Sequence, residues 1–188
     1  MVIQHFGDGC FRLQSGEVSL LVDPVNARLK GDVVLKTLVP AAIAAWADNE
    51  IFFAGEYEMK GLEIRGWQVE EESTDTFLKV AYRVDWEEMS FAFLGHLSKP
   101  PPPELIDKIG EPDVVFLPAG GGHFLSPDQA AKVAKQFEPK LIIPGFFSSP
   151  KEVAKAFGQN LLPQDKLVFK KKDLAKEGGR VVALSSNS

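Results

Sequence analysis

Residues 114–143 read VVFLPAGGGHFLSPDQAAKVAKQFEPKLII, and this stretch decides the fold. It begins and ends with short apolar runs, Val114–Leu117 and Leu141–Ile143, which are typical of strands buried on both faces. Between them, Ser126–Gln129 is an N-capping signal, and Ala130–Phe137 carries apolar residues at helical spacing. A strand, a helix and a second strand in this order predict a right-handed crossover within a parallel sheet.

The chain on either side of this stretch continues the same pattern. A helix is expected over residues 103–109, and a second capping signal, Ser149–Glu152, predicts another over 150–157. Final strands are expected over residues 167–170 and 181–184. The second half of the chain therefore alternates strands with helices.

The first half consists mainly of strands. Period-2 alternation, short apolar runs and intervening turn residues predict strands over 11–14, 18–22, 33–35, several segments of 51–69, 77–84 and 89–94. The alanine-rich segment Pro40–Ala47 predicts a short helix. An antiparallel first half joined to a crossover-rich second half indicates an α/β protein with two mixed sheets and helices outside.

Composition narrows the classes of function. A length of 188 residues fits one domain, 1–188, and a net charge of −5 argues against general affinity for nucleic acid. The single cysteine, Cys10, excludes an intrachain disulfide. The beginning of the chain lacks a secretory signal pattern, and its longest uncharged helix-like stretch is far shorter than the ~20 residues that span a bilayer. We expect a cytoplasmic protein without membrane contact.

Short segments spread along nearly the whole chain form an ordered set. They are GDGCF (7–11), LVDP (21–24), GDVVL (31–35), GEYEMKG (55–61), FLG (93–95), PAGG (118–121), EPK (138–140), IIP (142–144) and KKDL (171–174). In this order and spacing they resemble small hydrolases of the metallo-β-lactamase fold, above all the zinc-dependent branch that includes the ascorbate-phosphate lactonases. The resemblance implies a four-layer αββα sandwich with a metal site at one edge of the sheets.

The metal ligands that the resemblance implies are replaced here. That family takes ligands from an H-x-H-x-D-H segment after the fourth strand, whereas residues 36–41 read KTLVPA. His96 stands where the family has Asp, Phe146 where it has His, and Asp8 where it has the His of an early G-H-x-C motif. Apolar side chains cannot ligate zinc, so the inherited metal-dependent hydrolysis is expected to be lost.

Two groups of residues are candidates for a site. His96, His123 and Asp8 would form a residual metal site if the fold brings them together, with zinc as the alternative to having no cofactor. Gly120, Gly121, Gly122 and His123 lie between a strand and a capped helix, where free backbone N–H groups favour anions. The alternative for this loop is a tight turn with special backbone angles.

Three functions follow from these observations. The leading hypothesis is a metal-free, catalytically inactive relative of the hydrolases that binds a small molecule or a protein. The rival is a hydrolase with a rearranged site around His96 and His123. The third is an oligomer subunit with contacts at Phe146–Phe147 or Trp46. Glu56 and Glu58 would share one strand face with Lys60, which favours a solvated surface over an acid–base pair.

Overall fold

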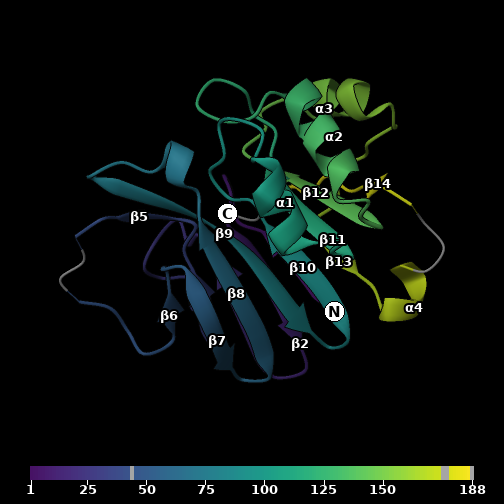
Figure 1. Cartoon of the computed structure of the whole chain (residues 1–188). Helices are drawn as coiled ribbons and strands as arrows, with labels where there is room; N and C mark the ends of the chain where they lie inside the picture. The colour runs from purple at the N-terminus through teal and green to yellow at the C-terminus, as the bar shows by residue number, and fades with distance from the viewer. Residues whose placement is uncertain (43–44, 175–177, 187–188) are drawn as a thin grey trace.

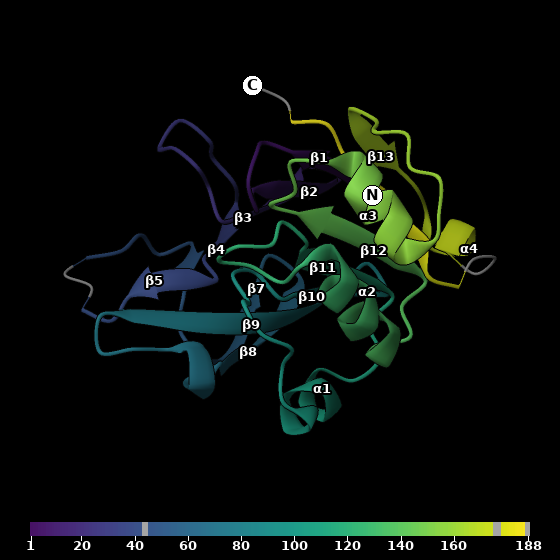
Figure 2. The ribbon, with the colours of Figure 1, turned by 90° about the horizontal axis from the view of Figure 1, so that it is seen from above.

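The computed structural model describes residues 1–42, 45–174 and 178–186, and it has two β-sheets packed face to face (Figure 1). Viewed from above, the helices α1 (Pro103–Ile109), α2 (Pro127–Gln136) and α3 (Pro150–Phe157) lie on the side of the second sheet that faces away from the first (Figure 2). The predicted α/β fold with mixed sheets and outer helices is thus confirmed.

The first sheet joins the two ends of the chain. Its strands in spatial order are β13 (Lys166–Val168), β1 (Val2–His5), β2 (Phe11–Ser15), β3 (Val18–Val22), β4 (Val33–Leu35) and β6 (Glu50–Ile51). The predicted hairpin is present as β2 and β3, which pair antiparallel around the turn at Gly16. Because β3, β4 and β6 are parallel neighbours, their carboxyl ends lie at one edge of the sheet.

The second sheet combines an antiparallel half with a parallel half. Its strands in spatial order are β14 (Arg180–Val181), β12 (Leu141–Gly145), β11 (Val114–Pro118), β10 (Met89–Phe93), β9 (Phe77–Trp86), β8 (Leu62–Gln68) and β7 (Gly55–Met59), and β5 (Leu38–Pro40) pairs with the start of β9. The strands β10, β11, β12 and β14 are parallel, as the opening stretch predicts. Their carboxyl ends therefore also share an edge.

Capping chemistry sets the ends of the helices. The Ser126 hydroxyl accepts a hydrogen bond from the Gln129 N–H at 3.2 Å, and the Gln129 side chain accepts one from the Ser126 N–H at 3.0 Å. This reciprocal pair is the predicted capping box, and it satisfies donors that a helix start leaves free. The helix α3 begins after Ser149 and ends at Gly158, whose φ of +64° lies in the left-handed region. A short helix, α4 (Lys171–Leu174), and a 3₁₀ turn, η1 (Glu70–Glu72), complete the described helical segments.

Strand alternation divides the apolar residues between two cores. In β10, Phe91 and Phe93 face the first sheet, whereas Ala92 faces the helices. In β11, Phe116 faces the first sheet and Val115 the helices. Each fully buried large apolar side chain contributes roughly 1.5–3 kcal/mol to the free energy of folding relative to an exposed one. The two cores therefore stabilise the layers largely independently of the side chains that form a site.

The expected helix over Pro40–Ala47 is wrong. Pro40 ends strand β5, where it pairs with Phe77, and the other described residues of the segment form no helix; residues 43 and 44 lie outside the described part. Backbone pairing with β9 prevails over the helix propensity of alanine. Loops cover part of the outer face of the first sheet. In these loops, Phe6 and Leu29 pack on Cys10, Leu21 and Val34.

Two further observations concern Cys10 and the membrane. Cys10 is fully buried, and burial raises the pKa of its thiol to about 11, so it is a small core residue. Within residues 1–42, 45–174 and 178–186, no helix has the length and apolarity needed to cross a bilayer.

Candidate functional site

The carboxyl ends of the parallel strands of both sheets meet at one edge of the molecule, and they form a cleft there. Asp23 follows β3, Thr37 lies two residues after β4, His96 lies three residues after β10, and Phe146 follows β12. The cleft has a volume of about 260 Å³ and is lined by Asp8, Gly9, Asp23, Pro24, Val25, Lys36, Leu38, His96 and Phe146. Crevices at the carboxyl ends of parallel strands are the usual ligand sites of α/β proteins.

A chain of hydrogen bonds links three polar side chains at the base of this cleft. Both carboxylate oxygens of Asp23 accept hydrogen bonds from Thr37, one from its N–H at 2.7 Å and one from its hydroxyl at 2.6 Å. The Thr37 hydroxyl lies 2.8 Å from His96 Nδ1. Thr37 is fully buried, and the side chain of Asp23 is only 10% exposed. The three groups satisfy one another in a place from which water is largely excluded.

This chain fixes the tautomer of a neutral His96 ring. Because the Thr37 hydroxyl donates its proton to Asp23, its oxygen accepts from Nδ1, and the Nε2 of a neutral ring is then unprotonated. Burial lowers the pKa of His96 against the opposing charge of Asp23, which favours the neutral ring. Burial raises the pKa of Asp23, while His96 and Thr37 oppose that rise.

His96 Nε2 is open to the cleft. It has no hydrogen-bond partner among the described residues. Nor is it one of the fully buried side-chain atoms without a partner, because in the described part of the chain Arg12 Nε is the only such atom. Nε2 is therefore a solvent-accessible acceptor.

Phe146 forms an aromatic wall beside His96. Its ring centroid lies 4.9 Å from that of His96 and 4.1 Å from that of Phe124, on which it stacks. Phe146 has a φ of +58°, which is costly for a residue with a Cβ, and its ring packs so closely on Gly9 that a Cβ there would overlap it. The surroundings thus hold this ring in a strained position over the cleft.

A buried carboxylate holds the loop that carries His96. Glu72, whose side chain is 5% exposed, accepts hydrogen bonds from the Ser98 N–H at 2.8 Å, the Ser98 hydroxyl at 2.6 Å, the Lys99 N–H at 3.0 Å and Lys79 Nζ at 2.7 Å. Burial alone would raise the pKa of Glu72, but these hydrogen bonds lower it. The loop that follows β10 is therefore fixed to η1 and β9.

The structure brings some of the sequence candidates together and separates others. Asp8 and His96 line the same cleft, and the charge of Asp8 acts on the His96 ring. His123 is exposed and is not among the residues that line this cleft.

The loop Gly120–Gly122 adopts special backbone angles. Gly121 and Gly122 have φ of +70° and +63°, and the Gly121 N–H donates to the Leu125 carbonyl at 3.0 Å. One of the donors that an anion would need is therefore used inside the turn.

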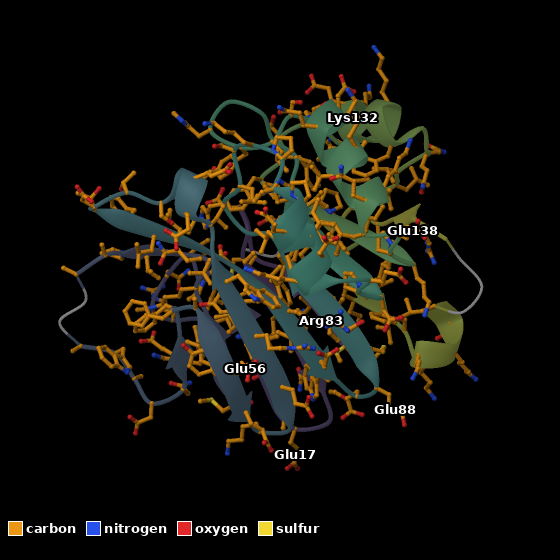
Figure 3. All side chains as sticks on the ribbon, viewed as in Figure 1. Glu17, Glu56, Arg83, Glu88, Lys132 and Glu138 are labelled. Carbon is orange, nitrogen blue, oxygen red and sulfur yellow. The ribbon has the colours of Figure 1, made fainter. Side chains whose placement is uncertain are left out.

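The remaining candidates lie outside the cleft or on its rim. Glu56 and Glu58 are exposed on β7, and Figure 3 shows Glu56 on the lower part of the sheet in that view. Trp46 is exposed and makes edge contacts with Phe52 and Phe53. Phe147 packs against the helix-side core.

Sequence reasoning missed Asp23 and Thr37 as members of the site. Each is a polar residue close behind a buried strand, and β3 and β4 are parallel neighbours. A polar residue placed just after each of two adjacent parallel strands is the signal that would have identified them.

Comparison with known proteins agrees with this fold. The profile of the Beta-lactamase superfamily domain matches residues 2–145, and the chain belongs to this family. A metal-dependent hydrolase of Methanopyrus kandleri is 32% identical over 104 residues, which cover 51% of this chain and 45% of that protein. The chain thus matches less than half the length of this relative.

Solved structures show the same architecture. A protein of Thermotoga maritima, described as a Zn-dependent hydrolase of the metallo-β-lactamase superfamily, has a TM-score of 0.80 at 24% identity, with 97% of each chain covered. The metallo-β-lactamase fold protein YhfI of Bacillus subtilis has a TM-score of 0.69 at 12% identity, with 100% of this chain and 98% of that one covered. These likenesses concern the fold.

The residues of the cleft do not fit the zinc site that the family implies. A catalytic zinc takes three protein ligands, and the described residues contain no group of three His, Cys, Asp or Glu side chains that could hold an ion. Both oxygens of Asp23 already accept from Thr37, and His96 turns Nδ1 toward Thr37. The neighbouring Phe146 ring offers no donor. His96 Nε2 and the carboxylate of Asp8 remain as possible ligands in the cleft, which is fewer than the three that a catalytic zinc takes.

Proposed function

We propose that this chain is a metal-free, catalytically inactive member of the β-lactamase superfamily that binds a small molecule in the cleft at the carboxyl ends of its sheets. The hydrogen-bond chain from Asp23 through Thr37 to His96 carries the proposal. It joins the polar groups to one another, so they do not converge on a common point where an ion would sit. The family scaffold is retained around a different arrangement of polar groups.

Two further observations support a binding role. The cleft is concave, contains apolar and polar groups, and has a volume close to the lower limit of ligand pockets, about 300 Å³. The strained backbone of Phe146 and the hydrogen bonds that hold the His96 loop give the cleft a defined shape. The single cysteine and the net charge of −5 favour action in the cytoplasm, without nucleic acid as a partner.

Metal analysis tests this proposal. The chain is purified without chelator, and its content of zinc, manganese and iron is measured together with that of His96→Ala. We expect substoichiometric metal that is the same in both proteins. Stoichiometric metal in the unmodified chain that disappears in His96→Ala would refute the metal-free assignment.

A hydrolase with a rearranged site is the second candidate, and the orientation of His96 supports it. The unprotonated Nε2 would act as a general base that takes a proton from water while the water oxygen adds to an acyl carbon. When the acyl–oxygen or acyl–sulfur bond then breaks, the ring would return this proton to the leaving alkoxide or thiolate. In this role the link through Thr37 to Asp23 would stabilise the protonated ring. His123, the other residue of this hypothesis, is exposed in its turn, so His96 alone carries it.

Substrate screening separates the two candidates. Lactone, thioester and phosphodiester substrates are tested with and without added metal, on the unmodified chain and on His96→Gln. The binding role predicts no turnover above background in either protein. Turnover that is lost in His96→Gln, and that does not need metal, would establish the hydrolase.

A further inference from the structure

The charged groups of the cleft leave an excess of negative charge. Lys36 is the only Lys or Arg among the residues that line the cleft, and its Nζ lies 2.8 Å from a carboxylate oxygen of Glu50. Lys79, which also acts on His96, is paired with Glu72. Both nearby cations are therefore neutralised by their own carboxylates.

Among the described residues, two carboxylates in the cleft form no ion pair with a Lys or Arg side chain, although the charge of Lys36 acts on Asp23 from a distance. Asp23 lies 3.7 Å from the His96 ring, which is neutral in the arrangement described above, and its hydrogen bonds come from Thr37. Asp8 is exposed at the rim, and within the described part of the chain its carboxylate has neither an ion pair nor a hydrogen bond. A cation bound in the cleft would be attracted by both carboxylates.

The uncharged groups of the cleft favour the same kind of ligand. His96 Nε2 is an acceptor that needs an N–H or O–H donor. The Phe146 ring, which Phe124 stacks on, also lines the cleft, and aromatic rings attract cations. Val25, Leu38 and Pro24 add apolar surface on the remaining side. An ammonium group supplies both the positive charge and the donors, and an attached apolar group would cover these side chains.

We propose that the cleft takes a small organic ammonium compound, with its nitrogen between Asp8 and His96 and its apolar part over Val25, Leu38 and Phe146. This proposal names the ligand class of the binding role above, and it rests on that role. A bound metal ion of charge +2 would outweigh the negative charge of the carboxylates in the cleft. The expected preference for cationic ligands therefore depends on the absence of such a metal from the cleft.

Three matched probes test the ligand class. Benzylammonium, benzyl alcohol and benzoate have similar size and differ in charge, and each is titrated into the metal-free full chain. Binding is followed by the backbone amide resonances of Gly9 and His96 in NMR spectra. We expect benzylammonium to bind about 5- to 50-fold more tightly than benzyl alcohol, since the neutral probe loses the carboxylate and ring contacts, and benzoate to bind weakest.

Variants locate the preference. Asp8→Asn should weaken benzylammonium binding about 2- to 5-fold and leave benzyl alcohol unchanged, because it removes one carboxylate charge and keeps the shape. Asn tolerates the left-handed φ of +50° at this position, so the fold should be retained. Glu17→Gln is the matched control: it also removes one charge, but Glu17 is exposed in the turn before β3, at the opposite end of that strand from Asp23 (Figure 3).

The outcomes distinguish this proposal from the function on which it rests. If benzoate or benzyl alcohol perturbs the cleft resonances at least as strongly as benzylammonium, the ammonium class is wrong and the binding cleft stands. Equal losses in Asp8→Asn and Glu17→Gln, or no binding of any probe, also overturn the ammonium class. Stoichiometric metal bound at His96 would refute the underlying function.

Discussion

The core between the sheets and the cleft at the edge of the same strands differ in almost every physical respect. In the core, Phe91 and Phe116 are buried among apolar side chains from both sheets. At the edge, a few residues farther along, Asp23 and His96 are polar groups held in largely buried positions, and Phe146 is strained. The core needs only apolar residues of suitable volume, whereas the edge needs particular groups in particular places.

This difference explains how a family scaffold persists while its metal site changes. The inter-sheet core is assembled from strand alternation and does not depend on the side chains that follow the strands. Replacement of the ligands therefore leaves the layers intact. The new groups at the edge need only satisfy their own hydrogen bonds, as Thr37 does with Asp23 and His96.

The largest expected effect lies in the core. Phe116→Ala removes a ring that packs against Phe93 and Phe11, with centroids 4.6 and 5.0 Å away. We expect the free energy of unfolding to fall by about 3–5 kcal/mol, since a large cavity is left in a rigid environment. Urea denaturation measures this change. A loss below about 1 kcal/mol would mean that the core relaxes easily and that its contrast with the edge is overstated.

A smaller effect is expected from the buried polar chain. Thr37→Val keeps the shape and removes the hydroxyl between Asp23 and His96, so it should cost about 1–3 kcal/mol of unfolding free energy. Thr76→Val, at an exposed hydroxyl, is the control and should change it by less than about 0.5 kcal/mol. Equal effects of the two substitutions in urea denaturation would show that the chain does not stabilise the edge.

The His96 ring should make stability depend on pH. Its pKa is lower in the folded protein than the ordinary 6.5, so the unfolded chain binds the proton more readily. The stabilising contribution of the neutral His96 ring to the free energy of unfolding is fully present above pH 6.5. It is lost as the pH falls from 6.5 through the lower pKa of the folded protein. Asp8, Asp23 and Lys79 are the charged groups that act on the ring.

The raised pKa of Asp23 acts with the opposite sign. Its contribution is present below the ordinary 3.8 and is lost as the pH rises through the raised pKa. Because of the His96 ring, the free energy of unfolding measured by urea denaturation should decline as the pH falls from 8 to 5, and this decline should be shallower in His96→Gln. The same slope in both proteins would contradict the burial of a neutral ring.

The smallest effect is expected on the exposed face of β7. Glu56→Gln should change the unfolding free energy by less than about 0.5 kcal/mol and leave probe binding unchanged, because the side chain is exposed and neither belongs to the inter-sheet core nor lines the cleft. Thermal unfolding monitored by circular dichroism is sufficient to measure it. A large loss would indicate a contact of Glu56 that the fold does not account for.

Local signals were sufficient to predict most of the fold from the sequence. The alternation in β10 and β11 and the cap at Ser126 act over a few residues, so they can be read without knowledge of distant neighbours. The segment from Pro40 misled for the opposite reason. Its strand depends on pairing with Phe77, which lies far along the chain.

The site was less predictable because it is made of distant segments. Asp8 and His96 could be named from the resemblance, and they line one cleft. The bonds that join Asp23, Thr37 and His96 depend on the parallel arrangement of strand ends, and the sequence alone contains no sign of their geometry. For the same reason, His123 was grouped with His96, although it lies exposed in its own turn.

Calorimetric titration of zinc into the chelator-treated full chain tests the central claim most directly. The unmodified chain, His96→Ala and Asp23→Asn are compared at neutral pH. If the polar groups of the cleft satisfy one another and cannot hold an ion, the unmodified chain shows no stoichiometric zinc binding beyond that of either variant. A tight, stoichiometric zinc site that both substitutions abolish would contradict this account.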